Sequence, residues 1–328
     1  MNNIDHIREV NARHQARILS IPGVTAMGVG FLSGADGSLT EEVGILIYIQ
    51  KVGIGAKSIP STIEGFKVDV RFGVFRSPSA DALHQDEFNC PPADVPKARG
   101  VEDDNPRNRL IEPMIGGIGA NPDFFYVSPT VGTIGLVVKN KAGGASILSN
   151  RHVIAGKKPK VGDPVSQPAR NVTGDKAASL VNWQLGDITY QGKRYGVDAA
   201  TATPTNGRSA TIGKMFELND LTGAGEPTLG LKVTKSGITT GITIGKITAI
   251  DLATSNDVGT EMSNQVVIRA VNHPGDFSAP GDSGSAIVAL TTNDTENVVA
   301  LLWGGNEDHE TVASPIVPIL DHFECTVV

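Results

Sequence analysis

The chain has 328 residues, of which 38 are glycine and 19 proline, and only 5% are aromatic. A net charge of −7, with no cluster of lysine or arginine, argues against nucleic acid and against an anionic membrane as partners. Two cysteines, Cys90 and Cys325, are too few for a disulfide framework, and no stretch has the apolar length of a membrane span or the apolar core of a signal peptide. We expect a cytoplasmic protein with two free thiols.

Residues 1–75 are expected to form a small α+β domain. Apolar residues at helical spacing alternate with runs of strand-forming residues, and the turn SGADGS joins two of these runs into a hairpin. Gly28 and Gly30 lack the spacing and the following helix of a dinucleotide-binding loop. The predicted helix and strands lie at residues 4–20, 23–32, 41–51 and 65–75, with a further short helix near 56–63.

Residues 76–111 hold prolines and charges with little apolar pattern. This composition predicts a linker or an extended arm on the protein surface. Exposed polar segments are also the usual sites of proteolytic cleavage, so a maturation cut within this segment is a further hypothesis.

From about residue 112 onward, short apolar runs are separated by glycine-rich turns, with no helical stretch between them. This pattern is typical of antiparallel barrels and sandwiches, so we predict a mainly β fold. Apolar residues at Ile316, Ile319, Leu320 and Phe323 predict a short closing helix over 315–324.

The segment PGDSGSAIV places Ser283 in a glycine-rich turn before an apolar run. A serine hydroxyl needs a base to remove its proton and donors to hold the oxyanion that forms after attack. Glycines on both sides allow a sharp turn, in which the amides of Gly281 and Ser283 can point to one spot.

The base and its orienting acid can be sought among the histidines and aspartates. Of seven histidines, His152 directly follows a buried-looking strand and opens a turn. Asp198 lies in a strand of small apolar residues, where a carboxylate is costly without a partner. Asp187 is the competing acid, and its charged neighbours favour a solvated position. Lys235 and Ser236 are adjacent, so they point to opposite faces of a strand and do not form a Ser–Lys pair.

Three segments, ILSNRHVIAG, GVDAATATP and PGDSGSAIV, resemble the histidine, aspartate and nucleophile segments of chymotrypsin/trypsin-fold serine peptidases, in the same order. The segment VTKSGITTGITIGKI resembles a bacterial and plant branch of these proteins that includes the plant NARROW LEAF type. The resemblance implies a trypsin-like domain over 112–328 built as a double antiparallel β-barrel. Its first barrel would span about 112–215 and its second about 216–314.

The same resemblance implies roles for individual residues. Ser283 would be the nucleophile, His152 the general base and Asp198 the acid that orients the imidazole, with the amides of Gly281 and Ser283 as the oxyanion hole. The chain would be a serine endopeptidase acting on protein or peptide substrates, with no cofactor and no metal.

The resemblance also implies substrate contacts. The segment LLWGG, with Leu302, Trp303 and Gly304, matches the strand that pairs with the substrate backbone. Phe277 matches the floor of the first specificity pocket, and its apolar side chain does not imply cleavage after lysine or arginine.

No segment resembles the activation site that gives trypsin a new N-terminus beside the residue matching Asp282. Regulation through residues 1–75, by a homo-oligomer or a regulatory partner, is our hypothesis instead. The alternative to an active peptidase is an inactive or gated scaffold protein on a protease fold.

Overall fold

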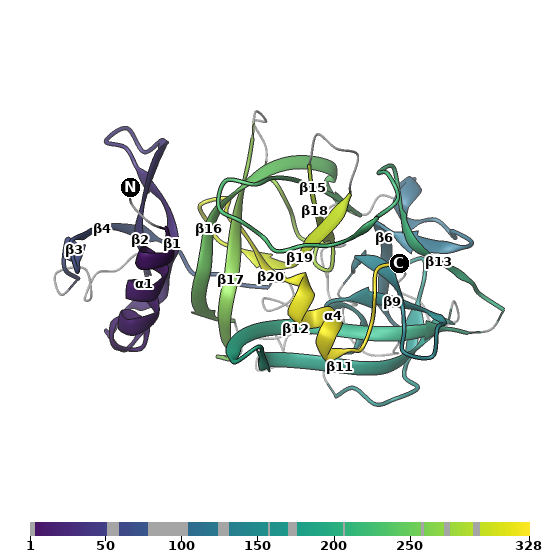
Figure 1. The fold of residues 1–328 in the computed structure, drawn as a ribbon. Coiled ribbons are helices and arrows are strands. Elements are labelled where there is room, and N and C mark those ends of the chain that lie inside the picture. Colours follow the sequence, from purple (N-terminus) through teal and green to yellow (C-terminus); the bar gives the residue numbers. More distant parts are fainter. Residues whose placement is uncertain are drawn as a thin grey trace, which may run out of the picture.

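The fold is mainly β, with few helices (Figure 1). The N-terminal helix and strands lie at one end, a closed barrel lies in the middle, and a second, rolled sheet lies beside it. The computed structural model describes residues 4–50, 59–77, 104–123, 131–156, 158–169, 176–205, 207–256, 259–271, 276–290 and 296–328. Cys90 and most of the predicted linker, residues 78–103, lie outside the described residues.

The N-terminal unit consists of one helix on a small sheet. Helix α1 buries Ile7, Val10 and Ile18 against the sheet, as its apolar spacing predicts. Strands β1 and β2 form the predicted hairpin, β4 runs parallel to β2, and β3 pairs with β4. The bounds are α1 (Ile4–Leu19), β1 (Val24–Ser33), β2 (Leu39–Ile49), β3 (Thr62–Ile63) and β4 (Phe66–Phe72).

The short helix predicted near 56–63 is only partly testable, because residues 51–58 lie outside the described residues. Its last two residues, Thr62 and Ile63, form strand β3, so the helix prediction is wrong there. Pairing with β4 across the tight turn at Glu64 and Gly65 explains the difference, since both turn residues adopt a positive φ.

The N-terminal unit continues directly into the barrel. Strand β1 pairs antiparallel with β16 (Gly241–Ser255), so that Gly30 lies opposite Ala249. A Cβ atom at Gly30 would lie 2.5 Å from the Thr248 carbonyl oxygen, so only glycine permits this close approach. One 11-stranded sheet therefore runs from the N-terminal unit through the barrel.

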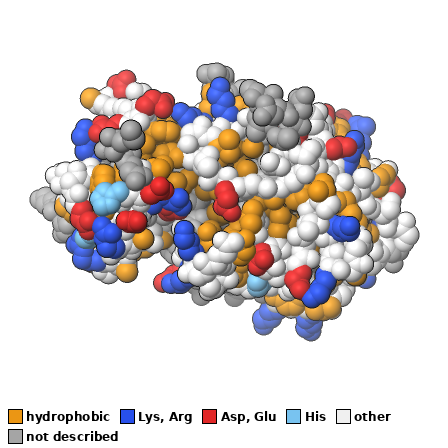
Figure 2. Space-filling model, in the orientation of Figure 1, with side chains coloured by type: hydrophobic (Ala, Val, Ile, Leu, Met, Phe, Trp, Pro, Cys, Tyr) orange, Lys and Arg blue, Asp and Glu red, His pale blue; other side chains and the backbone are white. Residues whose placement is uncertain are grey.

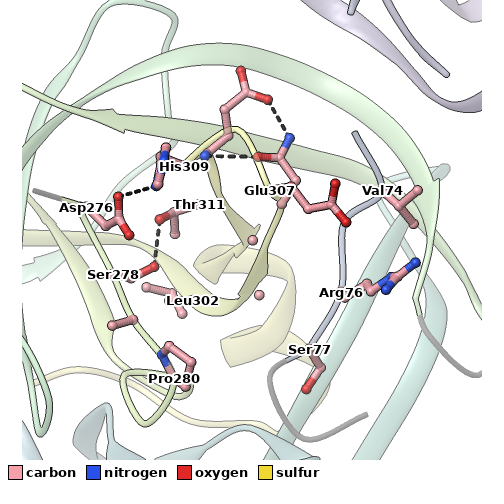
Figure 3. A pocket seen from close by; sticks show the side chains of 15 residues that line it. Val74, Arg76, Ser77, Asp276, Ser278, Pro280, Leu302, Glu307, His309 and Thr311 are labelled. Atoms are coloured by element: carbon pink, nitrogen blue, oxygen red, sulfur yellow. Dashed lines mark hydrogen bonds and ion pairs between the residues drawn. The ribbon is translucent and has the colours of Figure 1, made fainter. Parts of the chain in front are cut away.

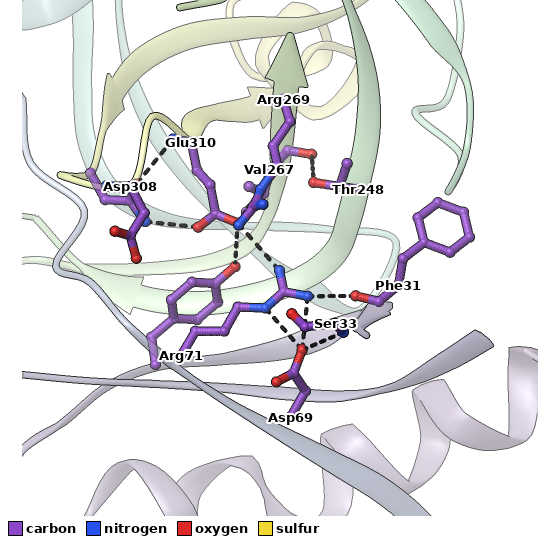
Figure 4. A network of polar contacts seen from close by, with 11 residues as sticks. Phe31, Ser33, Asp69, Arg71, Thr248, Val267, Arg269, Asp308 and Glu310 are labelled. Atoms are coloured by element: carbon purple, nitrogen blue, oxygen red, sulfur yellow. Dashed lines mark hydrogen bonds and ion pairs between the residues drawn. The ribbon is translucent and has the colours of Figure 1, made fainter. Parts of the chain in front are cut away.

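A buried ionic cluster adds to this junction (Figure 4). Arg71 of β4 donates to Glu310 at 3.3 Å and to the Phe31 carbonyl at 2.6 Å. Arg269 donates to the same Glu310 carboxylate at 2.7 Å, and the Tyr48 hydroxyl donates to it at 3.2 Å. Because Glu310 is buried, its charge is balanced by arginines from both sides of the junction.

The central barrel has six strands and is closed, because β15 pairs with both β16 and β18. This closed barrel is the second of the two predicted barrels. A short strand, β14 (Gly223–Ala224), adds to β19. The barrel strands besides β16 are β15 (Lys232–Gly237), β17 (Glu261–Ala270), β18 (Ala286–Ala289), β19 (Asn297–Gly305) and β20 (Thr311–Pro315).

The other sheet has seven strands in the order β7-β6-β10-β11-β12-β9-β8. Its two edge strands, β7 and β8, are separated by Gly135 alone, so the sheet rolls back on itself as in a barrel. The strands are β6 (Ile118–Pro122), β7 (Gly132–Ile134), β8 (Leu136–Lys139), β9 (Ala145–Ser149), β10 (Pro164–Ser166), β11 (Lys176–Tyr190) and β12 (Lys193–Pro204), with a separate pair β5 (Met114–Gly116) and β13 (Ala210–Met215).

The predicted closing helix is confirmed as α4 (Ile316–His322), which packs on β19 and β11. Within the described residues, no helix combines the length and the hydrophobicity needed to cross a membrane. On the face in Figure 2, basic and acidic side chains are interspersed.

Candidate active site

His152 and Asp198 come from neighbouring strands of the rolled sheet. His152 lies on the short helix α3 (Arg151–Ile154), directly after β9, and Asp198 lies on β12. The two strands pair with Ser149 opposite Ala200, which brings the side chains together. His152 Nδ1 lies 2.6 Å from Asp198 Oδ2, and the His152 amide donates to Asp198 Oδ1 at 3.2 Å.

Asp198 is buried, and 5% of its side chain is exposed. Burial alone would raise its pKa, but the charge of His152 and the two hydrogen bonds from that residue outweigh it, so the pKa lies below its ordinary value. Asn150 fixes the strand beneath by donating from Nδ2 to the Asp198 carbonyl at 2.7 Å. The lowered pKa favours the ionised carboxylate beside the imidazole.

Asp187, the competing acid, lies elsewhere. Its carboxylate accepts from the Ser263 amide at 2.9 Å and from the Ser263 hydroxyl at 2.6 Å. Arg194 Nε lies 2.8 Å from the same carboxylate, whose side chain is 9% exposed. Asp187 was expected to be solvated, but its carboxylate is paired. The hydrogen bonds from Ser263 join β11 to β17.

Ser283 lies in the turn before β18, and this turn rests on the rolled sheet through Thr133 of β7. The Thr133 amide donates to the Ser283 carbonyl at 2.8 Å, and its hydroxyl donates to the Gly281 carbonyl at 3.0 Å. Ser149, at the end of the strand that leads to His152, donates to the Thr133 carbonyl at 2.6 Å. Thr133 thus links the serine turn to the strand that carries the histidine.

The Ser283 side chain is 3% exposed. Its Oγ makes no hydrogen bond to His152 or to any other group in the described part of the chain. An unbonded buried hydroxyl is costly in a fold, so it needs an explanation beyond packing.

Two amides of the serine turn are also unused. Those of Asp282, Gly284 and Ser285 donate to backbone carbonyls, whereas those of Gly281 and Ser283 donate to none among the described residues. Gly281 has φ +105°, and a Cβ atom there would collide with Thr239 Oγ1. The turn therefore requires glycine at this position and leaves two N–H donors beside the Ser283 hydroxyl.

A buried ion pair holds this turn. Lys235 Nζ lies 3.3 Å from Asp282 Oδ2, and neither side chain is exposed. The Asp282 carboxylate also accepts from the Thr239 amide at 2.9 Å, from the Thr240 hydroxyl at 2.6 Å and from the Ala279 amide at 3.0 Å. Burial lowers the pKa of Lys235, and the Asp282 charge opposes this shift only in part.

A pocket of about 340 Å³ lies beside this turn (Figure 3). Leu302 and Gly304, two of the residues expected to contact substrate, line it, while Asp276 and Ser278 form the opposite side from Arg76. Asp276 and His309, which both line the pocket, are in polar contact, with Oδ1 and Nδ1 2.5 Å apart.

Phe277 and Trp303, the other two residues expected to contact substrate, are completely buried. The Phe277 ring packs beneath Lys235 Nζ, 5.8 Å from its centroid, and close to Gly245. The Trp303 indole donates to Gln265 at 2.7 Å. Phe277 belongs to the apolar cluster inside the barrel, whereas Trp303 packs in the cluster that contains Tyr48 and Phe75 of the N-terminal unit. Neither residue is among those that line the pocket.

Sequence patterns missed two features of this region. The Lys235 side chain pairs with Asp282, 47 positions further along the chain, and no local pattern indicates this partner. Arg76 and Ser77, the first two residues of the predicted linker, line the pocket together with Val74 of the predicted N-terminal domain. Among the described residues, no three histidine, cysteine or acidic side chains are grouped as metal ligands would be.

Comparisons with known proteins agree with this architecture. Residues 193–314 match the family model described as the Nal1 C-terminal domain. Serine protease 2 of Streptomyces fradiae is 27% identical over 126 residues, which cover 38% of this chain and 71% of that protein. These matches confirm the expected resemblance to chymotrypsin-fold serine proteases and to the Nal1 branch.

Solved structures of serine proteases are also similar. The Nocardiopsis protease NAPase has a TM-score of 0.45 and 19% identity, covering 64% of this chain and 96% of that one. A glutamic acid-specific serine protease, described as using a histidine triad in substrate binding, has a TM-score of 0.47 and 18% identity, covering 66% of this chain and 100% of that one.

Proposed function

We propose that this protein is a serine endopeptidase that cleaves peptide bonds through His152, Asp198 and Ser283. The observation that carries the proposal is the 2.6 Å contact between His152 Nδ1 and Asp198 Oδ2, beside a turn that presents an unbonded serine hydroxyl. Relationship to serine proteases supports the reaction class.

In the proposed mechanism, Ser283 Oγ attacks the substrate carbonyl and His152 accepts its proton. Because Nδ1 is committed to Asp198, proton transfer runs through Nε2. Asp198 holds the tautomer and offsets the charge of the imidazolium, a role for which its lowered pKa suits it. The imidazolium then returns the proton to the leaving amine, and water repeats the sequence on the acyl-enzyme.

The tetrahedral intermediate carries a negative oxygen that needs donors. The unused amides of Gly281 and Ser283 are the donors that we propose, since backbone N–H groups held in a fixed turn need no reorganisation during the reaction. Gly281 keeps its amide in place through a positive φ that other residues rarely adopt.

The proposed substrate is an extended segment of a protein, bound by main-chain pairing along β19 near Leu302 and Gly304. We place the activity in the cytoplasm on the basis of cysteine usage. Cys325 is a buried free thiol, and burial raises its pKa to about 11, which makes it a poor nucleophile.

Labelling with a fluorophosphonate tests the proposal, because this reagent reacts only with an activated serine. We expect the purified full chain to be labelled, and Ser283→Ala and His152→Ala to lose labelling. Ser285→Ala is the matched control, because its hydroxyl is also buried and unbonded among the described residues but lies two positions away. Labelling that survives in folded Ser283→Ala would contradict the assignment.

A gated or inactive scaffold is the second candidate, and one observation favours it. The Ser283 side chain is only 3% exposed, so access to its hydroxyl is restricted in this conformation. A folded wild-type chain that stays unlabelled would support this candidate over the active peptidase.

A further inference from the structure

The segment Phe75–Ser77 pairs with the end of β19 through a β-bridge at Arg76. The Arg76 amide donates to the Gly305 carbonyl at 2.8 Å, and the Gly305 amide donates to the Arg76 carbonyl at 3.0 Å. The two residues form an antiparallel bridge. This pairing satisfies both main-chain groups of Gly305, the last residue of β19.

The pairing lies on the side of β19 that faces the serine turn. On this side Leu302 pairs with that turn: it accepts from the Gly284 amide at 2.8 Å and donates to the Ser285 carbonyl at 3.0 Å. The pairing of β19 with β20 shifts by one residue between Leu302 and Gly304. As a result, Gly305 is the next residue whose main-chain N–H and C=O point to the same edge of β19 as those of Leu302. Arg76 and the serine turn are therefore neighbours along one edge.

The direction of the segment brings it toward Ser283. Because the bridge to Gly305 is antiparallel, the chain runs from Arg76 to Ser77 as β19 is followed backward. A Cβ atom at Gly304 would collide with the Arg76 carbonyl and lie 3.3 Å from the Ser77 amide. Glycine at 304 thus permits close approach of this peptide unit, and Ser77 enters the pocket opposite Pro280 (Figure 3).

The segment is anchored by its first residue. Phe75 is completely buried, and its ring meets Tyr48 edge-on at a centroid distance of 5.0 Å. It belongs to the same apolar cluster as Trp303 of β19. Arg76 is exposed, so its contribution at this edge comes mainly from its main-chain N–H and C=O groups.

We infer that Phe75–Ser77 is a built-in occupant of the edge at which a peptide substrate would pair. An extended peptide that pairs with Gly305 in the same direction must displace Arg76, because each main-chain group of Gly305 already has its partner. The ligand class of this edge is therefore an extended peptide, and the chain's own segment competes with it. The inference rests on the proposed function for the identity of the competitor, but the competition itself is a binding property.

Peptide binding tests the inference without requiring catalysis. The probe is a fluorescein-labelled peptide with the sequence FGVFRSPSA, residues 72–80, and the protein is the full chain carrying Ser283→Ala. Arg76→Pro removes the amide that donates to Gly305 without altering β19, and Arg76→Ala is the matched control that keeps this amide. We expect the dissociation constant measured by fluorescence anisotropy to be about tenfold lower for Arg76→Pro than for Arg76→Ala.

Equal binding to both variants, or no binding to a folded Arg76→Pro chain, would overturn the inference. Hydrogen exchange at Gly305 offers a second test that needs no peptide: its amide should be protected in Arg76→Ala and exchange faster in Arg76→Pro. Equal protection in both would also overturn it. Failure of fluorophosphonate labelling, by contrast, would affect only the proposed function, since the binding measurements use a chain without the Ser283 hydroxyl.

Discussion

Lys235 and Asp282 form an ion pair in which neither side chain is exposed. Asp282 directly precedes Ser283 in the chain. The side chain that holds Asp282 in the structure comes from β15. The serine turn is therefore held by Lys235, which reaches Asp282 as soon as the barrel folds. Cleavage of the chain is not needed to supply this contact.

Replacement of Lys235 by methionine should leave Asp282 buried without its cation. Removing one partner of a buried pair costs about 3–5 kcal/mol, so the free energy of unfolding should fall by that order. Urea denaturation of Lys235→Met measures this change.

The double variant Lys235→Met with Asp282→Asn is the control, because it removes both charges. Its loss of stability should be smaller than the sum of the two single losses. Additive losses would contradict direct coupling between the two side chains. Labelling of Ser283 should fall in every one of these variants, since each disturbs the contacts that hold its turn.

Asp198→Asn should abolish most of the activity while leaving the fold intact. In the trypsin-type triad the equivalent change lowers kcat by about 10⁴, because the imidazole adopts the wrong tautomer. We expect fluorophosphonate labelling to slow by about 10³–10⁴. Asp187→Asn is the matched control from the same sheet and should leave the labelling rate unchanged, since Asp187 contacts Arg194 and Ser263 instead.

The lowered pKa of Asp198 also predicts a dependence of stability on pH. A carboxyl whose pKa is lower in the folded state binds fewer protons there than in the unfolded chain. Its stabilising contribution is therefore complete above its unfolded pKa of about 3.9, and it is lost as pH falls through the folded value. Urea unfolding measured between pH 6 and pH 2 should show a shallower decline for Asp198→Asn than for wild type below about pH 4.

Local patterns predicted the residues of the proposed site one strand or turn at a time. His152 could be predicted because it directly follows a run of buried-looking residues, which forms β9. Asp198 could be predicted because a carboxylate in a strand of small, apolar residues requires a partner. Ser283 could be predicted from the glycines on both sides of it, which allow a sharp turn. Each of these residues carries its signal within a few positions of the chain.

Contacts between distant segments carried no such signal. Lys235 meets Asp282 only because the barrel closes between β15 and β18. The predicted strand 23–32 was expected to pair only within its hairpin. The strand observed there, β1, also pairs with β16, whose polar and apolar pattern gives no indication of a second partner. The family resemblance implies Phe277 at the floor of the first specificity pocket, and in the structure its ring packs close to Gly245 inside the barrel. The approach of Arg76 to Gly305 is equally non-local.

The geometry of the serine turn depends on glycine at 281. Gly281→Ala would place a methyl group against Thr239 Oγ1, a hydroxyl that already donates to the Pro280 carbonyl at 2.8 Å. The turn must shift, and its amides with it, so labelling of Ser283 should slow by about 10²-fold or more. A labelling rate within about twofold of wild type would argue against these amides as the oxyanion donors.

Gly143→Ala is a control for Gly281→Ala, because it introduces backbone strain without a steric collision. Gly143 also has a positive φ, +85°, but a Cβ atom there would meet nothing within 4 Å. We expect a loss of stability of about 1 kcal/mol from the backbone alone and an unchanged labelling rate.

The buried cluster around Glu310 should determine how firmly the N-terminal unit holds to the barrel. Glu310→Gln removes the one charge that Arg71 and Arg269 share, which leaves the buried Arg71 guanidinium beside Arg269 with Asp69 as its remaining acidic contact. The free energy of unfolding should fall by about 3–5 kcal/mol, whereas Glu307→Gln, at an exposed neighbour, should change it by less than about 0.5 kcal/mol. Because β1 pairs with β16, we expect both variants to unfold in a single urea transition, followed by tryptophan fluorescence and by circular dichroism. Two separate transitions in Glu310→Gln would mean that the N-terminal unit folds independently of the barrel, despite the sheet that they share.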